Sequence, residues 1–263
     1  MAGVLLITGG SRGIGAATAR LAAAEGYQVA VNYRMRGDAA EAVVAEIETA
    51  GGRAAAFQGD VAHESDVERL FAEVEARFAP PAALVNSAGI SPGKRAVADF
   101  EADQLARLIA VNVVGTMLCC REAVRRMSSR RGGRGGAIVN VSSMAAVTGG
   151  RPGSSHYAAT KAAVDAFTIG LAKEVATEGI RVNAVRPGMT LTDMTEPALG
   201  DPAVGSAIAA TIAMNRVAAP EEIARPIVWL LSEAASFVSG CCLDASGGGF
   251  MIGATKPIVP LDP

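Results

Sequence analysis

The chain has 263 residues, of which half are hydrophobic and 19% are charged. This balance is typical of folded globular proteins and excludes an intrinsically disordered chain. The formal charge of −2 excludes a globally basic nucleic-acid-binding protein, and no apolar run approaches the roughly 18 residues that span a bilayer. The cysteines form two adjacent pairs, without the C-x-x-C spacing of zinc and redox sites. We therefore expect a reduced cytoplasmic protein with no metal and no nucleic-acid or membrane partner.

Short apolar runs alternate along the chain with longer amphipathic segments. The runs cover residues 4–7, 29–32, 54–57, 83–86, 137–141, 181–185 and 242–245, and each has the length and bounding residues of a buried strand. The segments between them have apolar residues at helical spacing, and several end at a glycine (Gly26, Gly51, Gly179), which favours a helix C-cap. This alternation predicts an α/β fold of about seven parallel strands with helices on both faces, in a single domain over residues 1–263.

Three local features complete the prediction. Ser65, followed three residues later by Glu68, is typical of a helix capping box. Residues 125–136 read as a helix end that runs into a flexible loop. The tail of about 250–263 is too rich in proline for a helix interior.

The first strand leads directly into the turn TGGSRGIG (8–15), and a helix follows. Glycines at positions 9, 13 and 15 allow positive φ angles, let a pyrophosphate approach the backbone and let the helix pack closely on the sheet. The helix N-terminus offers free amide groups to an anion. In this strand–turn–helix context we favour nucleotide binding over a merely tight turn.

The residues after the second strand bear on the choice of nucleotide. An NAD-selective protein places an acidic residue at the end of that strand to bind the ribose hydroxyls, whereas here Tyr33 and Arg34 follow and the first carboxylate is Asp38. Together with Arg12 in the glycine turn, Arg34 favours a 2′-phosphate and therefore NADP. If both arginines are ordinary surface charges, NAD remains possible.

Tyr157 and Lys161 are four residues apart on a predicted helix and so share a face. An ammonium group near a phenol favours the phenolate, which lets a tyrosine with an ordinary pKa of about 10 act as a base. Ser143 follows a strand end, where its hydroxyl can bond a substrate oxygen that gains charge.

Together these residues resemble the short-chain dehydrogenase/reductase family, over nearly the whole chain from Thr8 to about Gly248. The resemblance rests on an ordered set of motifs: TGGSRGIG (8–15), Asp60-Val61, NSAG (86–89), Asn112 in NVVG, VNVSS (139–143), YAATK (157–161) and RPG (186–188) with Thr192. It implies a Rossmann-type doubly wound sheet and hydride transfer between nicotinamide and a secondary alcohol or ketone. The chain is similar to both 3-oxoacyl reductases and glucose dehydrogenases, so both substrate types stay open.

The resemblance also assigns roles to residues. Tyr157 would exchange a proton with the substrate oxygen, Ser143 would orient that oxygen, Lys161 would bind the nicotinamide ribose and lower the pKa of Tyr157, and Asn112 would hold a water. Ser142 is adjacent, and the choice of Ser143 rests on the family pattern alone. The residues implied at the cofactor are Gly9, Ser11, Arg12, Gly13, Ile14, Gly15, Tyr33, Arg34, Asp60, Val61, Asn86, Ala88, Gly89, Tyr157, Lys161, Pro187, Gly188, Thr190 and Thr192.

The resemblance further implies a small alcohol or carbonyl substrate under a cap of about residues 189–214, and a homotetramer or homodimer. Two other functions stay open: a catalytically silent nucleotide-binding scaffold or sensor, and a dock for an acidic partner at the arginine-rich segment 121–134. For that segment we favour an ordinary solvated loop, because no aromatic residues are interleaved. His156 is expected to be a partly exposed residue at a helix start.

Overall fold

The computed structural model describes residues 3–249, so the tail expected over residues 250–263 lies outside the described residues. In the described part, seven parallel strands form one sheet in the order β3-β2-β1-β4-β5-β6-β7. The strands are β1 (Val4–Thr8), β2 (Gln28–Tyr33), β3 (Arg53–Gln58), β4 (Pro81–Asn86), β5 (Gly136–Val141), β6 (Ile180–Pro187) and β7 (Cys242–Ala245). The predicted strands and their parallel arrangement are confirmed.

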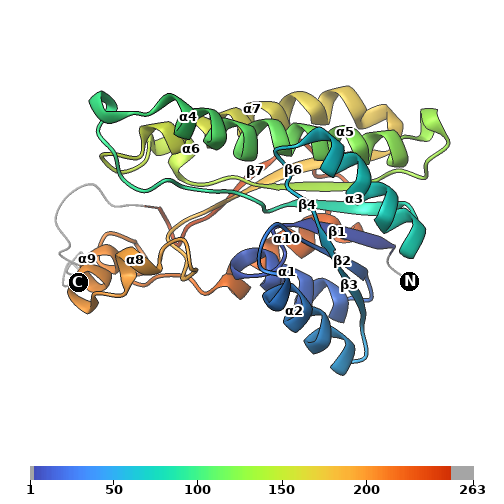
Figure 1. Cartoon of the computed structure of the whole chain (residues 1–263), viewed down its shortest axis with the longest axis horizontal. Coiled ribbons are helices and arrows are strands. Elements are labelled where there is room, and N and C mark those ends of the chain that lie inside the picture. Colours follow the sequence, from blue (N-terminus) through green and yellow to red (C-terminus); the bar gives the residue numbers. More distant parts are fainter. Residues whose placement is uncertain (1–2, 250–263) are drawn as a thin grey trace, which may run out of the picture.

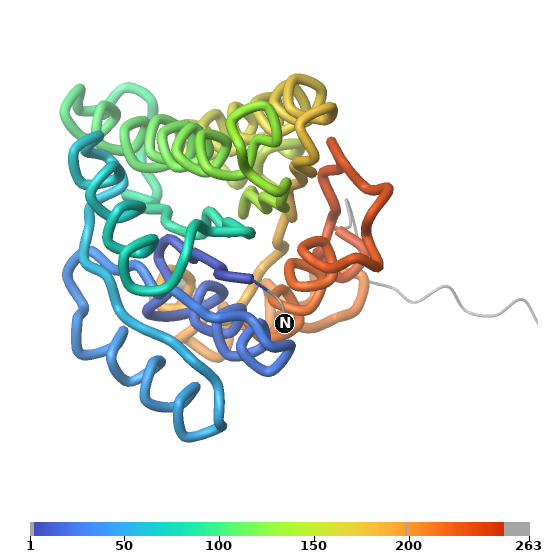
Figure 2. Tube along the Cα trace, turned by 90° about the vertical axis from the view of Figure 1, so that its right-hand side faces the viewer, coloured from blue at the N-terminus to red at the C-terminus, as the bar shows by residue number. Residues whose placement is uncertain are grey.

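Helices cover both faces of this sheet (Figure 1). One layer contains α1 (Gly13–Ala24), α2 (Gly37–Thr49) and α10 (Pro220–Leu231), and the other contains α3 (Glu64–Arg77), α5 (Gly115–Met127) and α7 (Ser155–Val175). Figure 2 shows the two layers from another side, with the blue α1 and α2 below the strands and the green and yellow α5 and α7 above them. The doubly wound architecture is therefore confirmed.

The central strand β1 shows why its sequence is apolar throughout. All five of its residues are buried. Leu5 and Ile7 belong to the core on the α1 and α10 side, whereas Val4 and Leu6 belong to the core on the α3 and α5 side. Because successive side chains point to opposite faces of a strand, a strand covered on both faces needs apolar residues at every position.

The shorter elements connect these layers. They are η1 (Val97–Asp99), α4 (Ala102–Ile109), the π-helix η2 (Ala110–Val114), η3 (Ser129–Arg131), α6 (Ala145–Thr148), η4 (Ala176–Glu178), α8 (Glu196–Leu199), α9 (Pro202–Ala209) and η5 (Glu233–Ala235). Figure 1 shows α8 and α9, which lie in the predicted cap, set apart from the two helical layers.

The run Ala102–Met127, formed by α4, η2 and α5, is one continuous helix that is long and apolar enough to cross a membrane by length and composition. Val111, Cys119 and Met127 on this helix belong to the core that packs against the sheet. Packing on the sheet thus explains the apolar residues on one face of the helix, whereas Ile109, Val114 and Met117 are exposed.

The capping box predicted at Ser65 is wrong. Helix α3 begins at Glu64, and His63 occupies the N-cap position without a side-chain hydrogen bond. The carboxylate of Asp66 instead accepts a hydrogen bond from the backbone N–H of Asp60 at 3.0 Å, which ties the first turn of α3 to the segment after β3. A side chain bonded to the preceding segment has replaced the local cap.

The arginine-rich segment 121–134 is only in part the solvated loop that was favoured: its first residues lie on α5, which ends at Met127, and the exposed residues 129–132 follow, as expected for a helix end that runs into a loop. Three of its arginines lie on α5 and contact the buried carboxylate of Glu122 at 2.7–3.1 Å: Arg121, Arg125 and Arg126. Arg130 lies 3.7 Å from Glu178. Four of the six arginines therefore face carboxylates of their own chain, which removes most of the free charge that a dock for an acidic partner would need.

Candidate active site

The glycine turn has the shape of a phosphate cradle. Gly9 and Gly13 have φ angles of +64° and +54°, and a Cβ on Gly15 would lie 2.3 Å from the carbonyl oxygen of Gly9. Arg12 occupies the N-cap position of α1, and its side chain makes no hydrogen bond to the first amide groups of that helix. Ser11 and Ile14 are half-buried in the same turn. The turn therefore fits a dinucleotide's diphosphate, which needs close backbone approach and free amides.

A buried asparagine that the sequence analysis missed braces this turn. The Oδ1 of Asn32 accepts a hydrogen bond from the N–H of Gly9 at 3.3 Å, and its Nδ2 donates to the carbonyls of Phe57 and Gly59 at 3.3 and 3.1 Å. Asn32 is 2% exposed. One side chain thus ties the glycine turn to the end of β3. The available signal was a polar residue that closes an otherwise apolar strand.

Asp60 lies beyond β3, and its carboxylate is held from two sides. Its Oδ1 accepts from the N–H of Ala62 at 3.0 Å, and its Oδ2 accepts from Arg107 of α4 at 2.6 Å. Burial acts to raise the pKa of Asp60, but these hydrogen bonds outweigh it and the pKa lies below its usual value. Arg107, absent from the sequence prediction, is a second positioning residue. Val61 packs instead into the core.

The arginines expected near a 2′-phosphate already have carboxylate neighbours. Arg12 pairs with Asp193 at 2.8 Å, and Arg34 lies 3.8 Å from Asp60. Tyr33, half-buried at the end of β2, lies close to Gly37, where an added Cβ would be 3.3 Å from its ring. Both arginines are about half exposed, so a bound anion could reach either of them.

Residues after β4 reach both the glycine turn and the predicted catalytic residue Lys161. A Cβ on Gly9 would lie 2.8 Å from the Cα of Ala88, and a Cβ on Gly89 would lie 3.6 Å from the Nζ of Lys161. The side chain of Asn86 points elsewhere, because its Nδ2 donates to Asn140 at 2.9 Å inside the protein. Any contact between Asn86 and a cofactor would therefore have to use its backbone.

Helix α7 brings Tyr157 and Lys161 together beside Ser143. The Nζ of Lys161 lies 5.8 Å from the centre of the Tyr157 ring and donates to the carbonyl of Val141 at 2.8 Å. Ser143 lies close enough to the Tyr157 phenol to act against the rise in its pKa. The neighbouring Ser142 is buried and donates instead to the carbonyl of Lys161. The hydroxyl of Ser142 is therefore turned into the protein, and Ser143 is the serine that lies beside Tyr157.

Burial shifts both titratable groups of this site toward their neutral forms. It raises the pKa of Tyr157 to about 12, against the opposing effect of the Ser143 hydrogen bond. It lowers the pKa of Lys161 to about 8, against the opposing charge of Asp165. A charge on either group is therefore costly unless the other group, or a bound ligand, compensates for it.

Asn112 lies in the π-helix and joins the segment after β4 to α7. Its side chain exchanges two hydrogen bonds with the backbone of Ile90, at 2.9 and 3.0 Å, and donates to the hydroxyl of Thr160 at 3.1 Å. Both amide hydrogens are thus used within the protein, so a water could reach this side chain only at its oxygen.

The segment after β6 closes the site against the glycine turn. It starts at Pro187 and Gly188, and the buried Thr190 donates to the Gly188 carbonyl at 3.2 Å. Thr192 lies beside Gly13, where an added Cβ would be 3.3 Å from its methyl group. The predicted cofactor segments therefore meet along the carboxyl ends of the strands.

His156 is not the partly exposed residue that was expected. It is 8% exposed, and its ring meets the edge of Phe100 with centroids 4.9 Å apart. Nearby, the N–H of Arg95 donates to the carbonyl of Gly153 at 2.9 Å. The segment after β4 thus covers the start of α7, next to Tyr157.

The cap and residues 217–219, which follow it, together line an apolar hollow of about 320 Å³. Its lining residues are Leu191, Leu199, Gly205, Val217, Ala218 and Ala219. None of them is charged, and Tyr157 is not among them. The hollow therefore offers apolar surface beside the segment after β6 and includes none of the predicted catalytic residues.

Comparison with known proteins gives consistent matches over most of the chain. Residues 9–249 match the family described as Enoyl-(Acyl carrier protein) reductase. The chain is 47% identical to the uncharacterized oxidoreductase YgfF of Escherichia coli (strain K12), over 93% of this chain and 99% of the relative. It is 39% identical to a 3-oxoacyl-[acyl-carrier-protein] reductase of Synechocystis (94% and 97% covered) and 38% identical to an L-rhamnose 1-dehydrogenase (NAD(P)(+)) of Sphingomonas (94% and 96% covered).

Solved structures agree with these matches. A mutant of a Serratia marcescens short-chain dehydrogenase/reductase superposes with a TM-score of 0.86 at 33% identity, over 93% of this chain and 96% of that one.

Proposed function

Given that the chain belongs to the short-chain dehydrogenase/reductase family of NAD(P)-dependent enzymes acting on CH–OH groups, we propose that it prefers NADP(H) and interconverts a secondary alcohol and a ketone, with Tyr157 as acid and base. The observation that carries this proposal is the cluster of Ser143, Tyr157 and Lys161, with Asn112 alongside. The bound nicotinamide would accept or supply the hydride, and the residues of the chain manage the proton.

The chemistry of the cluster follows from its burial. A phenolate at Tyr157 is costly because its surroundings are dry, but the same dryness strengthens its attraction to the ammonium of Lys161. Ser143 can donate to the substrate oxygen as charge develops on it, and Tyr157 can give that oxygen its proton in reduction or remove it in oxidation. Asn112 supports the arrangement by holding α7 to the segment after β4.

The variant Tyr157→Phe tests this role. It should lower kcat on a panel of secondary alcohols and ketones by about 10²–10⁴-fold, the usual contribution of a general acid–base group, and leave the Kd for NADPH within about twofold. Tyr27→Phe is a matched control, because it removes a phenol that donates only a 3.4 Å hydrogen bond to Leu231, in another part of the fold. Full activity of Tyr157→Phe would refute the assignment.

The preference for NADP(H) rests on Arg12 and Arg34 and on the lack of an acid after β2. Arg34→Gln should weaken binding of NADP⁺ about tenfold and leave binding of NAD⁺ nearly unchanged, as measured by calorimetric titration. Tighter binding of NAD⁺ by the unaltered chain would overturn this preference.

For the substrate we propose a small or medium ketone or alcohol with an apolar body, supported by the uncharged hollow in the cap. We also propose a homodimer or homotetramer in a reducing cytoplasm. Exposed apolar residues on the α4–α5 helix (Ile109, Val114, Met117) support the oligomer, which sedimentation would detect. All four cysteines are free, as a reducing compartment requires.

A further inference from the structure

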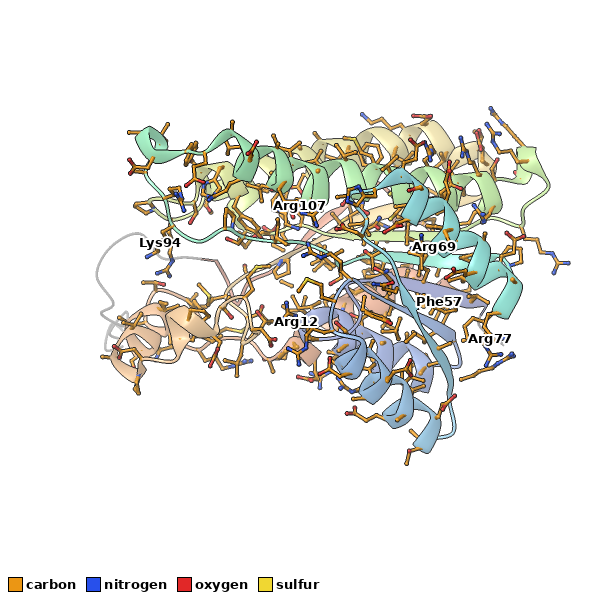
Figure 3. The ribbon with its side chains drawn as sticks, viewed as in Figure 1. Arg12, Phe57, Arg69, Arg77, Lys94 and Arg107 are labelled. Carbon is orange, nitrogen blue, oxygen red and sulfur yellow. The ribbon has the colours of Figure 1, made fainter. Side chains whose placement is uncertain are left out.

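One ion pair joins the two ends of the site across 181 residues of sequence. The Nη1 of Arg12, at the start of α1, lies 2.8 Å from the Oδ2 of Asp193 in the cap. Figure 3 shows Arg12 at the side of α1 that faces the segment carrying α8 and α9. Both side chains are more than half exposed, at 57% and 58%. The pair is therefore open to exchange with a ligand from solution.

The backbone around Asp193 presents it in a fixed place. The hydroxyl of Thr195 accepts from the N–H of Thr192 at 3.0 Å and also bonds the Thr190 carbonyl, which closes a small turn around Asp193. The same turn rests on Gly13 through the methyl of Thr192. A carboxylate is thus held beside a turn whose shape suits a diphosphate.

Arg34, the other arginine expected at a 2′-phosphate, has a different carboxylate neighbour. The carboxylate nearest to Arg34 is Asp60, at 3.8 Å, and that carboxylate is already neutralised by Arg107 at 2.6 Å. Arg34 can therefore turn to an anion without leaving Asp60 unpaired. Arg12 gives Asp193 one of its N–H donors, so a phosphate that draws the guanidinium away leaves Asp193 with the more distant charge of Arg36 alone, close to the added negative charge.

We propose that Asp193 is a specificity-determining residue, which competes with the 2′-phosphate of NADP(H) for Arg12 and thereby lowers the discrimination between NADP(H) and NAD(H). This inference rests on the proposed function. NAD(H) lacks the phosphate and leaves the Arg12–Asp193 pair intact, so the cap stays tied to α1. NADP(H) draws Arg12 away from Asp193, and the contact of Thr192 with Gly13 then remains as the tie between the cap and α1.

The test is a double-mutant cycle of Asp193→Asn and Arg12→Gln, with Kd values for NADP⁺ and NAD⁺ from calorimetric titration. Because exposed ion pairs contribute at most about 1 kcal/mol, or about fivefold in Kd, Asp193→Asn should tighten NADP⁺ binding by about three- to fivefold and change NAD⁺ binding by less than about 1.5-fold. In the Arg12→Gln background the effect specific to NADP⁺ should vanish. Glu196→Gln, which removes an exposed carboxylate of the same cap, is the matched charge control.

Equal tightening of both dinucleotides by Asp193→Asn would overturn the inference, since it would show a general charge effect. An NADP⁺-specific effect of Asp193→Asn that persists in the Arg12→Gln background, or that Glu196→Gln reproduces, would also overturn it. If the unaltered chain bound both dinucleotides, these results would refute the role of Asp193 and leave the proposed function standing. If it bound neither, the proposed function would fall and the inference with it.

Discussion

Replacing Lys161 by methionine should stabilise the cofactor-free chain while abolishing turnover. Lys161 is 6% exposed, and burial lowers its pKa from 10.5 to about 8. At pH 7 the folded chain therefore carries a buried charge that it accommodates poorly. Methionine has a similar length and no charge, so it removes this penalty together with the cation that we propose stabilises the Tyr157 phenolate.

The size of the effect follows from the pKa shift. At 1.36 kcal/mol for each tenfold change in proton affinity, the shift from 10.5 to about 8 makes the charged lysine destabilising by about 3 kcal/mol at pH 7. The variant also loses the 2.8 Å hydrogen bond to the Val141 carbonyl, which offsets about 1–2 kcal/mol of that. We expect a net gain of about 1–2 kcal/mol for Lys161→Met at pH 7.

The pH dependence gives the sharper test. Between pH 8 and 10.5 the unfolded chain binds more protons at Lys161 than the folded chain does, so the unfolding free energy of the wild type rises through that window relative to the variant. The charge penalty of about 3 kcal/mol at pH 7 should fall to about half of that at pH 9.5. Urea unfolding of both proteins at the two pH values measures this, and a difference that stays constant with pH would refute the reasoning.

The remaining predictions concern two separate glycines, Gly15 and Gly170, and Glu122, the buried acid of α5. Gly15→Ala should abolish binding of either dinucleotide, because its Cβ would meet the Gly9 carbonyl oxygen at 2.3 Å. Normal binding by this variant would contradict the assignment of the glycine turn as a phosphate cradle. By contrast, Gly170→Ala, in an open stretch of α7, should raise the unfolding free energy by about 0.5–1 kcal/mol. Glu122→Gln should cost about 2 kcal/mol at pH 7, because it leaves three arginines short of their shared carboxylate. Burial acts to raise the pKa of Glu122, but the arginines hold it below its ordinary value of 4.5. The stability that the Glu122 carboxylate contributes is therefore present above pH 4.5 and is lost as the pH falls through the lower pKa of the folded state. Urea unfolding of both proteins at pH 7 and pH 3 measures this loss.

Local pattern was enough to predict the sheet, the glycine turn and the residues that follow strand ends. Each of these depends on neighbours within a few residues: an apolar run long enough for one strand, or glycines spaced for one turn. The carboxyl ends of parallel strands share one edge, so residues at several strand ends could be placed near one another before any contact was known.

The positioning residues could not be found this way. Arg107 reaches Asp60 across 47 residues, and Asn32 reaches Gly59 across 27. Such partners depend on how a helix is rotated or how a loop returns, and the sequence pattern of either element alone does not carry that information. His156 was misplaced for the same reason, because a segment more than 50 residues earlier in the chain covers it.

The contact between the cap and the glycine turn has a consequence for synthesis. Thr192 and Asp193 leave the ribosome long after the first fifteen residues, and strands β2 to β6 are made in between. A nascent chain that ends before β6 therefore has an open cradle, with neither the threonine that rests on Gly13 nor the carboxylate that faces Arg12. Dinucleotides can aid folding through the finished pocket only near the end of translation, and an amino-terminal fragment would have only part of that pocket.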